Sequence, residues 1–393
     1  MHPVVSHDPV SHGPPCMDEV SVGPSVLIVG AGVAGLALAR ALSQRSIDCT
    51  VVERRYSTTT LGMGLNLPGN AVRALTHLGV LDQARAYGVP VSRREYRTST
   101  GRLLFSTDDA AFWSKVGTPL CLRHGHLLTA LRTPPTGTVL HGTEVLTARP
   151  HGSRVAVQTT DGNVPLQDFV VAADGVHSTL RSAIADSHSA IRRSAMTQSS
   201  WRFVLGNPGV DCWTTWSGAR ATFLMIPVGN GEVYGYASSI RGEPTGSDPG
   251  WLTNTFADFP APVTTAIESL RAGFGEMHHA LVEEVRLPTW HSGRLVLIGD
   301  AAHATGPVWA QGAAQAMEDA LVLADVLARQ TDWSTAGEAF ESARRARVEH
   351  VQTATDKMSR LARLPTWLRA VGAPFLGPRA YREAYEPLRS NPF

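Results

Sequence analysis

The sequence has few cysteines, no excess of either charge and no long apolar run. The four cysteines among 393 residues (Cys16, Cys49, Cys121 and Cys212) form no CxxC pair, which argues against a metal site and against a disulfide framework. Basic and acidic residues number 35 and 34, so no basic field would steer the chain onto nucleic acid or anionic lipid. No run reaches the roughly 18 apolar residues of a membrane span, and the N-terminus lacks an apolar signal core. These absences predict a cytoplasmic protein, outside the membrane, that acts on a small neutral molecule.

The first residues differ in composition from the rest of the chain. Residues 1–24 are rich in His and Pro and have no periodic apolar pattern, which predicts a disordered leader. The length allows two or three domains, or one large domain with an insertion.

A βαβ unit is predicted directly after the leader. Residues 25–29 and 49–52 are apolar and β-branched, as in strands buried on both faces, and residues 33–42 suit a helix packed on a sheet. This order implies a parallel sheet with a right-handed crossover. Similar short runs at 169–173 and 295–298 predict two more strands of the same sheet.

The region between those later strands has a different pattern. Residues 221–227 and 232–238 flank an Asn-Gly pair, which is typical of a β-hairpin. We therefore expect a second, antiparallel sheet inserted into the first domain. Residues 313–328 and 338–363 predict long helices.

The first motif is a dinucleotide-binding turn. Residues 30–35 match GxGxxG between a predicted strand and a predicted helix. Gly30 makes the tight turn, Gly32 lets the backbone approach a pyrophosphate, and Gly35 lets the helix lie close to the strand. Glu53 ends the next strand, where its carboxylate can accept hydrogen bonds from ribose hydroxyls and would repel a 2′-phosphate. The bound dinucleotide is therefore expected to be FAD or NAD rather than NADP.

Two further motifs make the comparison with a family specific. Residues 171–181 place Asp174-Gly175 directly after a strand, and the segment resembles the DG motif of flavin monooxygenases related to para-hydroxybenzoate hydroxylase. Residues 299–307 resemble their GD motif, and residues 311–320 resemble the element that follows it. The resemblance covers about residues 25–350.

The chemistry of FAD fits these positions. Asp300, at the carboxyl end of a parallel strand, can accept hydrogen bonds from the ribityl hydroxyls. The helix predicted from Gly312 points backbone N–H groups at the flavin edge that becomes anionic on reduction. A nicotinamide dehydrogenase needs neither feature.

Smaller matches add residues to the expected cofactor site. The segment 122–128 resembles one whose arginine lies near the flavin chain, so Arg123 is carried over, although a solvated arginine at a helix start is an alternative. Residues 62–67, with Gly64, resemble the loop at the isoalloxazine edge, although these glycines could serve only a turn. The chain departs from the family at Ala310, where many relatives have glycine. The added methyl group can alter the loop conformation or oxygen access.

The resemblance implies an α/β fold, with a Rossmann-like FAD-binding domain built mainly on a parallel sheet, an inserted antiparallel β-sheet substrate domain and C-terminal helices. We expect the FAD-binding domain at 25–90, 117–188 and 286–350, the substrate-binding domain at 91–116 and 189–285, and a C-terminal helical segment at 351–393.

The resemblance also implies an activity. In the family, NADH or NADPH binds transiently and reduces the flavin, O2 forms a C4a-hydroperoxide, and one oxygen atom hydroxylates an aromatic or polycyclic small molecule. The cofactor carries this chemistry, and the protein excludes water and positions the substrate. The cofactor-binding residues expected are Gly30, Gly32, Val33, Ala34, Gly35, Glu53, Arg54, Gly64, Arg123, Val145, Asp174, Asp300, Gly312 and Ala313.

The sequence indicates the residues of the reaction centre and of the substrate pocket less directly than those of the cofactor site. No catalytic acid–base pair is expected, and the loop near the reaction centre contributes Pro307, Trp309 and Ala310. Alternation in the predicted hairpin places Thr222 and Leu224 on one face and Tyr234 and Tyr236 on one face of the partner strand. If these faces look toward the flavin, they line the substrate pocket together with Pro307; packing on a helix or exposure to solvent is the alternative.

Other functions remain open on the sequence. A Baeyer–Villiger, epoxidising or N-oxygenating enzyme would use the same fold and cofactor. A flavin-dependent halogenase is disfavoured because Trp213 and Trp216 are not followed by Ile-Pro at the required spacing. A non-enzymatic FAD-binding protein is disfavoured because all three motifs are complete. His303 is expected to be structural. The substrate and its regiochemistry, the choice between NADH, NADPH and a separate reductase, and the oligomeric state are not determined by the sequence.

Overall fold

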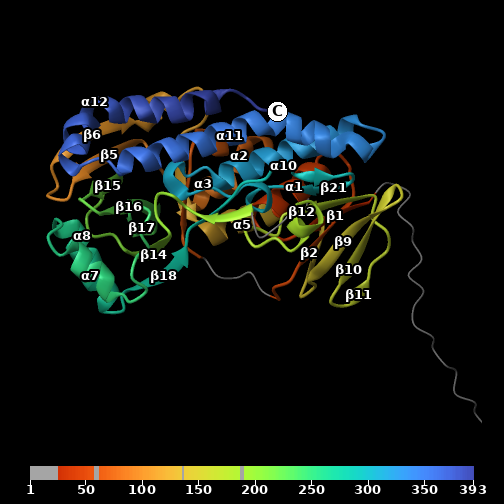
Figure 1. Ribbon diagram of the computed structural model, residues 1–393, viewed down its shortest axis with the longest axis horizontal. Helices are drawn as coiled ribbons and strands as arrows, with labels where there is room; N and C mark the ends of the chain where they lie inside the picture. The colour runs from red at the N-terminus through yellow and green to blue at the C-terminus, as the bar shows by residue number, and fades with distance from the viewer. Residues whose placement is uncertain (1–24, 57–61, 135–136, 186–189) are drawn as a thin grey trace, which may run out of the picture.

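The computed structural model describes residues 25–56, 62–134, 137–185 and 190–393. Two β-sheets lie toward opposite ends of the molecule, and the long helix α11 (Ala336–Ala362) runs across the top of both (Figure 1). Helix α10 (Gly312–Arg329) lies beneath α11, and α12 (Thr366–Tyr385) lies above one end of the molecule. The expected leader lies outside the described residues.

The first sheet is mainly parallel, as the sequence predicts. Its six strands have the order β20-β21-β12-β1-β2-β8. Their bounds are His291–Ser292, Leu295–Leu297, Phe169–Ala172, Val26–Val29, Cys49–Glu53 and Thr138–His141. β1 pairs in parallel with both β12 and β2, and only β20 runs antiparallel. The prediction that the runs near 169 and 295 join the strand at 26 is confirmed.

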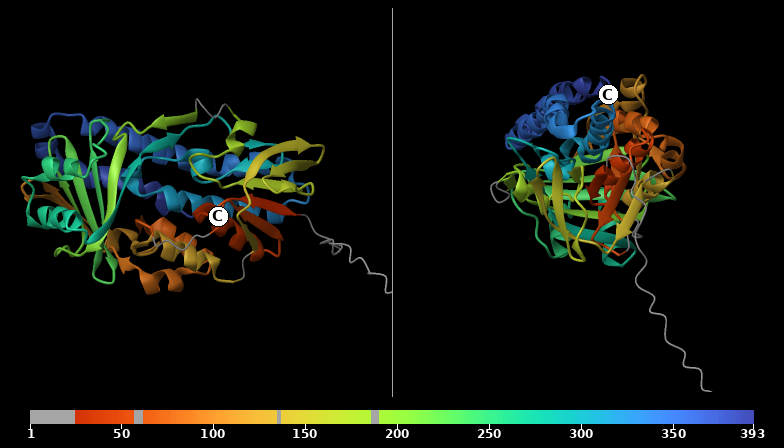
Figure 2. Two further views of the ribbon diagram at one scale, coloured as in Figure 1. Left: turned by 90° about the horizontal axis from the view of Figure 1, so that it is seen from below. Right: turned by 90° about the vertical axis from the view of Figure 1, so that its right-hand side faces the viewer.

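Helices cover one face of this sheet. α1 (Val33–Ser43) is rich in Ala and Leu and is buried along most of its length, where it packs between the sheet, α10 and α5 (His124–Arg132). A smaller antiparallel sheet lies at the other side, visible beside the main sheet in Figure 2, and consists of β9 (Val145–His151), β10 (Arg154–Thr159) and β11 (Gly162–Asn163). The parallel sheet is therefore covered on both faces, which explains its apolar strands.

The second sheet has seven strands in the order β18-β14-β17-β16-β15-β5-β6. Their bounds are Gly275–Leu281, Ser199–Gly206, Glu232–Ser239, Ala221–Gly229, Trp213–Ser217, Arg93–Thr98 and Leu103–Asp108. The hairpin β16–β17 confirms the Asn-Gly prediction, with positive φ angles of 53° at Asn230 and 70° at Gly231. The sheet is antiparallel, as expected, except at one pair, because β5 enters from an earlier part of the chain and lies parallel to β15.

The two faces of the second sheet have different neighbours. On one face, Phe203, Phe223 and Met225 form an apolar cluster with α7 (Gly250–Phe256) and α8 (Ala261–Arg271). The other face packs against β3 (Gly64–Leu67) and β7 (Leu120–Arg123) of the first half of the molecule. Helices α7 and α8 therefore lie on the side opposite to the face that we assigned to the substrate.

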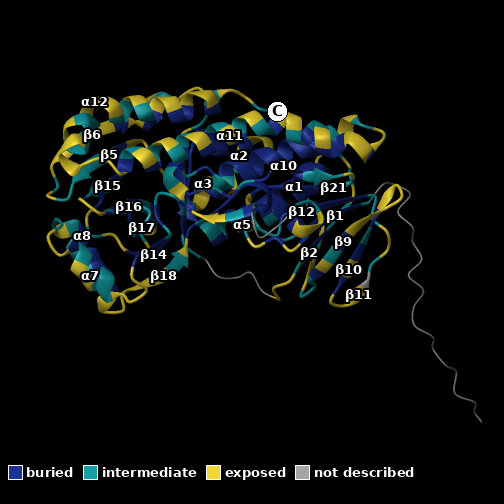
Figure 3. Cartoon of the chain, viewed as in Figure 1, coloured by how far each residue is buried: buried dark blue, intermediate teal, exposed yellow. Residues whose placement is uncertain are grey.

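The C-terminal helices follow their predicted positions. α10 and α11 extend one or two residues beyond the expected starts, which is the usual uncertainty at helix ends. Figure 3 shows α10 as a buried helix and α12 as a largely exposed one. Within the described ranges, no helix has both the length and the apolar content needed to cross a membrane.

Candidate active site

A pocket of about 200 Å³ lies at the carboxyl ends of β1, β2 and β12. Six residues predicted to bind the cofactor line it, namely Gly30, Gly32, Glu53, Arg54, Val145 and Asp174. Thr143 and Glu144 complete the wall beside Val145. The structure therefore brings together residues from four separate parts of the chain at the edge where α/β sheets bind dinucleotides.

Two of the three glycines of the first motif, Gly30 and Gly35, meet a packing requirement. Gly30 has a φ of +106°, and a Cβ atom there would lie 2.5 Å from the carbonyl oxygen of Ala173. At Gly35 a Cβ atom would lie 1.9 Å from the carbonyl oxygen of Gly30, so helix α1 can approach the turn only without a side chain. A Cβ atom at Gly32 would meet nothing within 4 Å. This open side, at the N-terminus of α1 with Val33 and Ala34, fits a pyrophosphate.

Glu53 is held in place by backbone N–H groups. Its Oε2 accepts a hydrogen bond from the N–H of Ala31 at 2.9 Å, and its Oε1 accepts one from the N–H of Arg55 at 3.0 Å. Carboxylate oxygens have further acceptor capacity beyond these two bonds. The side chain is therefore oriented beside the glycine turn, as an acceptor of ribose hydroxyls requires.

The DG motif supplies a buried carboxylate and a buried arginine. Oδ2 of Asp174 accepts a hydrogen bond from the N–H of Thr179 at 2.9 Å, whereas Oδ1 has no partner among the described residues. Burial raises the pKa of Asp174 despite these bonds. Arg181 is buried and donates from Nε to the carbonyl oxygen of Ala301 at 3.0 Å. Arg181 therefore joins the DG motif to the GD motif, a link that the sequence did not reveal.

The GD motif and the start of α10 lie side by side. A Cβ atom at Gly312 would lie 3.8 Å from Oδ1 of Asp300. Asp300 begins the short helix α9 (Asp300–His303), and its carboxylate stays accessible although the surrounding protein raises its pKa by desolvation. Within the described part of the chain, no side chain caps the N-terminus of α10, which begins at Gly312 and Ala313. Free N–H groups and a carboxylate acceptor at one place fit the flavin and ribityl parts of FAD.

Arg123 and Gly64 occupy the boundary with the second sheet. Arg123 is buried, and its guanidinium donates to Glu232 at 2.8 Å and to Glu276 at 3.0 Å. The alternative of a solvated arginine is therefore wrong, and its contact with the cofactor stays a prediction. Gly64 lies in strand β3 rather than in a turn, and a Cβ atom there would lie 2.3 Å from Cβ of Tyr234. The glycine allows the second sheet to approach the FAD-binding half.

The loop before α10 is held against α12, and its place near the reaction centre stays a prediction. Pro307–Trp309 forms the short 3-10 helix η2, and Trp309 packs against Tyr385 of α12, whose hydroxyl donates to the carbonyl oxygen of Trp309 at 2.8 Å. Ala310 follows with φ 52° and ψ 39°, in the left-handed region. This conformation favours glycine and costs an alanine about 1 kcal/mol. A glycine at this position would adopt the same conformation without that cost.

The face of the second sheet that looks toward the first carries the expected pocket residues. Thr222, Leu224, Tyr234 and Tyr236 are each half-buried, whereas the residues between them are buried among α7 and α8. Leu224 and Tyr234 pack against the apolar cluster that contains Cys121 and Ile226. The place of the four residues in a substrate pocket therefore stays a prediction, and Pro307 lies in the loop described above. Desolvation by the surrounding protein raises the pKa of Tyr234 to about 12, although the charge of Arg202 opposes the rise.

Arg202 and Ser200 were missed by the sequence analysis. Arg202 pairs with Tyr236 across β14 and β17, and Ser200 pairs with Ser238, so both lie on the same face as the tyrosines. Nε of Arg202 and Oγ of Ser200 are buried without a hydrogen-bond partner in the described part of the chain. An arginine between Trp201 and Phe203 in a strand was the available signal, because it places a charge among buried aromatic residues.

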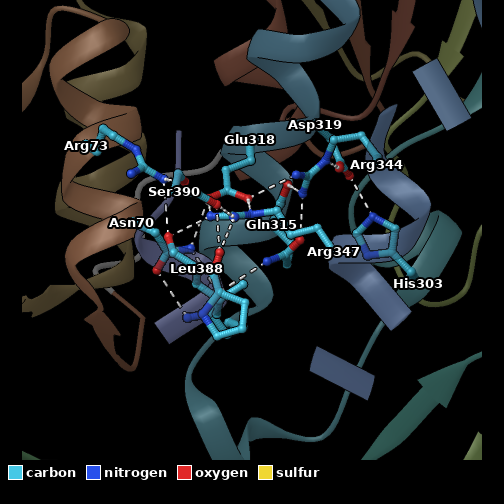
Figure 4. A network of polar contacts seen from close by, with 12 residues as sticks. Asn70, Arg73, His303, Gln315, Glu318, Asp319, Arg344, Arg347, Leu388 and Ser390 are labelled. Atoms are coloured by element: carbon cyan, nitrogen blue, oxygen red, sulfur yellow. Dashed lines mark hydrogen bonds and ion pairs between the residues drawn. The ribbon is translucent and has the colours of Figure 1, made fainter. Parts of the chain in front are cut away.

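A second group of buried polar residues lies behind the cofactor site (Figure 4). Glu318 accepts hydrogen bonds from Arg344 at 3.0 Å and from Arg347 at 2.7 Å. Asp319 accepts from Arg344 at 2.8 Å, from the N–H of Gly299 at 2.8 Å, and bonds His303 at 2.7 Å. We call this group, with Asn70, Gln311 and Gln315, the α10 network.

The α10 network supports the site without facing it. Burial alone raises the pKa of Glu318 and of Asp319, but the arginine charges, and His303 at Asp319, outweigh burial and lower both. Asp319 holds Gly299, next to Asp300, and Asn70 bonds Gln311 at the start of α10. This agrees with the structural role expected for His303. Two adjacent acids in an apolar helix were the signal that the sequence offered.

Comparisons with known proteins identify the family. The model of the FAD binding domain family matches residues 24–358. The chain is 31% identical over 364 residues to the 2-heptyl-3-hydroxy-4(1H)-quinolone synthase of Pseudomonas aeruginosa, covering 88% of this chain and 92% of that protein. It is 29% identical over 347 residues to 3-hydroxybenzoate 6-hydroxylase 1 of Aquipseudomonas alcaligenes, covering 84% and 87%.

Solved structures agree on the fold. The Klebsiella pneumoniae HpxO structure complexed with FAD and uric acid superimposes with a TM-score of 0.77 at 24% identity, over 94% of this chain and 93% of that one. The 2-methyl-3-hydroxypyridine-5-carboxylic acid oxygenase tetramer superimposes with a TM-score of 0.76 at 22% identity, over 94% and 99%. Together with the three motifs and the cradle that they form, these likenesses establish that the chain belongs to the FAD binding domain family and is an FAD-dependent monooxygenase.

Proposed function

We propose that this enzyme hydroxylates an aromatic or polycyclic small molecule with one atom of O2, using electrons from transiently bound NADH or NADPH. The observation that carries the proposal is the face of the second sheet formed by β14, β16 and β17. Half-buried aromatic and aliphatic side chains there surround polar atoms that have no partner among the described residues. A planar ligand with one polar substituent suits such a surface.

We propose that different residues of the cofactor site bind different parts of the FAD molecule. Glu53 accepts the ribose hydroxyls, the N-terminus of α1 with Gly32 receives the pyrophosphate, and Asp300 accepts the ribityl hydroxyls. The free N–H groups of Gly312 and Ala313 face the edge of the flavin that gains negative charge on reduction. When bound, FAD supplies the electron transfer and the oxygen activation.

Arg202 is proposed to recognise the polar substituent of the substrate. Its charge lies near Tyr234, Tyr236 and Asp300, since it influences the pKa of all three. A guanidinium Nε–H without a partner favours an acceptor such as a phenolate, a carbonyl or a carboxylate oxygen. Leu224 and the tyrosine rings provide the apolar walls that exclude water. The substrate class is therefore an aromatic molecule with at least one oxygen acceptor on its ring.

The division into domains and the location are also proposed. Strands β5 and β6 join the seven-stranded sheet, which supports the assignment of residues 91–116 with 189–285 to the substrate-binding domain. Residues 25–90, 117–188 and 286–350 form the FAD-binding domain, and residues 351–393 the helical segment. The scarcity of cysteine supports a cytoplasmic enzyme.

The test is a screen of aromatic and polycyclic acceptors with the FAD-loaded enzyme. NADH or NADPH oxidation and O2 uptake are measured together, and products are analysed by mass after reaction under ¹⁸O2. We expect stimulated oxidation and a product that gains one ¹⁸O atom on a ring carbon. A product in which oxygen is inserted between two carbons would indicate a Baeyer–Villiger enzyme. Oxidation that no acceptor stimulates would contradict the proposal.

A further inference from the structure

The C-terminal helices contain a segment with an excess of basic over acidic residues. Between Asp356 and Glu383 the chain has six basic residues and no acidic one, although the whole sequence holds 35 basic and 34 acidic residues. The basic residues are Lys357, Arg360, Arg363, Arg369, Arg379 and Arg382. The rest of the chain therefore has more acids than bases. The balanced total, from which we expected no attraction to anionic lipid, conceals a strongly basic segment.

The same segment exposes large apolar side chains. Trp367, Val371 and Phe375 follow one another at intervals of one helical turn along α12 and are 68%, 65% and 79% exposed. Leu364, Leu368 and Leu376 lie beside them and are also exposed. We call these six residues the α12 patch. Figure 3 shows the corresponding part of α12 as an exposed helix at the outer edge of the molecule.

The exposure of the α12 patch does not result from a loosely attached helix. Tyr381 and Tyr385, at the end of α12, are buried in a cluster with Trp113, and the hydroxyl of Tyr381 accepts a hydrogen bond from the indole of Trp113 at 3.0 Å. Arg369 donates to the carbonyl oxygens of Gly218 and Ala219, both at 3.1 Å. The helix is therefore fixed to the protein on one side while the patch faces outward.

Basic residues flank the α12 patch at both ends. Arg360 and Arg363 precede it, and Arg379 and Arg382 follow it. Glu383 pairs with both Lys357 and Arg379. For Arg360, Arg363 and Arg382, the described residues provide no carboxylate within ion-pair distance. An apolar centre between unpaired cations is the pattern of a helix that lies in a membrane interface.

We propose that the α12 patch and its flanking arginines form a docking surface for an anionic lipid bilayer. The apolar side chains enter the boundary between headgroups and acyl chains, and the arginines contact lipid phosphates. A second copy of the chain fits this surface poorly, because a two-fold interface places the same patch on both sides and brings the two sets of arginines together. An enzyme docked in this way takes up substrate at the membrane surface.

The test measures binding of the FAD-loaded, full-length enzyme to unilamellar vesicles by sedimentation. One set of vesicles contains phosphatidylcholine with 30% phosphatidylglycerol, about the composition of an anionic membrane, and the other contains phosphatidylcholine alone. We expect binding to the anionic vesicles, weaker binding at high salt, and little binding to the neutral ones. Absence of binding to the anionic vesicles would overturn the proposal.

Variants in the α12 patch and a control variant elsewhere distinguish specific binding through the patch from nonspecific adsorption to vesicles. The variant Trp367→Ala/Phe375→Ala should lower the partition coefficient about tenfold or more, and Arg360→Glu/Arg363→Glu should lower it by roughly fivefold for each cation removed. Phe274→Ala, which removes an equally exposed aromatic side chain in another region, should leave binding unchanged. The four substituted residues of the two test variants are exposed, so unfolding is not expected, and the FAD content of each variant checks this.

The outcomes decide between a membrane and a protein partner. If the Trp367→Ala/Phe375→Ala variant binds vesicles as the wild type does, the α12 patch is not the docking surface. The wild type could instead fail to bind vesicles and form a dimer in analytical ultracentrifugation. If the Trp367→Ala/Phe375→Ala variant is then a monomer, the surface is an interface between two copies. Either result overturns the proposal.

Discussion

The α10 network and the inner face of the second sheet both contain buried polar atoms, but only in the α10 network do all of them have hydrogen-bond or ion-pair partners among the described residues. In the α10 network, Glu318, Asp319 and Arg344 are fully buried, and each has two or more charged or hydrogen-bonding partners. On the inner face of the second sheet, Arg202 and Ser200 have polar atoms that lack partners among the described residues. The paired group acts within the fold, and the unpaired group is available to a ligand.

The energetics of burial make this difference informative. A buried polar atom without a hydrogen-bond partner lowers the stability of the fold by about 1–3 kcal/mol. A bound ligand that forms the missing hydrogen bond removes this cost. A buried charge network is different, since removal of one member leaves the others uncompensated. Substitutions in the two groups should therefore change different properties of the enzyme.

The largest effect is expected from Arg344→Met. This substitution removes the cation that both Glu318 and Asp319 contact, and should lower the free energy of unfolding by about 3–5 kcal/mol. Urea unfolding of the FAD-free protein measures the change. Arg329→Met serves as the control, because the Arg329 side chain is 77% exposed and, among the described residues, its one ion-pair partner is Asp325. A loss that does not exceed that of the control would show that the α10 network does not stabilise the fold.

Acid sensitivity should distinguish the α10 network from Asp300. The pKa values of Glu318 and Asp319 are lowered in the fold, so their contribution is present above the ordinary carboxyl pKa and is lost as the pH falls below it. The pKa of Asp300 is raised, so its contribution is present at low pH and is lost as the pH rises. Asp300→Asn should therefore stabilise the FAD-free protein at neutral pH and not in acid. Melting temperatures between pH 3 and pH 8 test both signs.

A smaller effect, on binding, is expected from Asp300→Ala. If Asp300 accepts the ribityl hydroxyls, its loss should weaken FAD binding by about 1–3 kcal/mol, which is tenfold or more. Titration of the FAD-free protein with FAD, followed by flavin fluorescence, gives the dissociation constant. Asp325→Ala, on the outer part of α10, should leave FAD affinity unchanged. Equal affinity in wild type and Asp300→Ala would remove Asp300 from the cofactor site.

The smallest effect is expected from Ala310→Gly. Ala310 has a left-handed conformation, which glycine adopts without steric cost, so the substitution should stabilise the protein by about 0.5–1 kcal/mol after the greater entropy of the unfolded glycine is allowed for. Thermal unfolding measures this gain, and Ala336→Gly, a buried alanine at the start of α11, should lose stability instead. A lower melting temperature for Ala310→Gly would contradict the strain assigned to this loop.

The features that the sequence predicted are local, and those that it missed depend on distant contacts. The glycine turn at Gly30 and the hairpin at Asn230 are specified by a few neighbouring residues, so their geometry followed from the motifs. The pairing of Arg202 with Tyr236 requires the register of two strands. The bonds of Arg344 require the packing of α11 on α10. A parallel pair between β5 and β15 was not predictable either, because nothing in the two segments encodes their direction.

The sequence predicts the cofactor site better than the substrate site, again because the first depends on local motifs and the second on distant contacts. The predicted cofactor residues come from short motifs at strand ends, and six of them line one pocket. The pocket residues in the hairpin were assigned by alternation alone, which gives two faces without saying which one looks inward. The position of α7 and α8 on the opposite face supplied the missing information.

The variant Arg202→Met tests most directly whether an unpaired polar group serves a ligand. Coupling, as oxygenated product per NAD(P)H oxidised, is measured with the best acceptor from the screen, together with KM and the melting temperature of the FAD-free protein. We predict an unchanged or higher melting temperature, a KM raised about tenfold or more, and hydrogen peroxide released in place of product. Unchanged KM and coupling, or a loss of stability as large as that of Arg344→Met, would contradict the account.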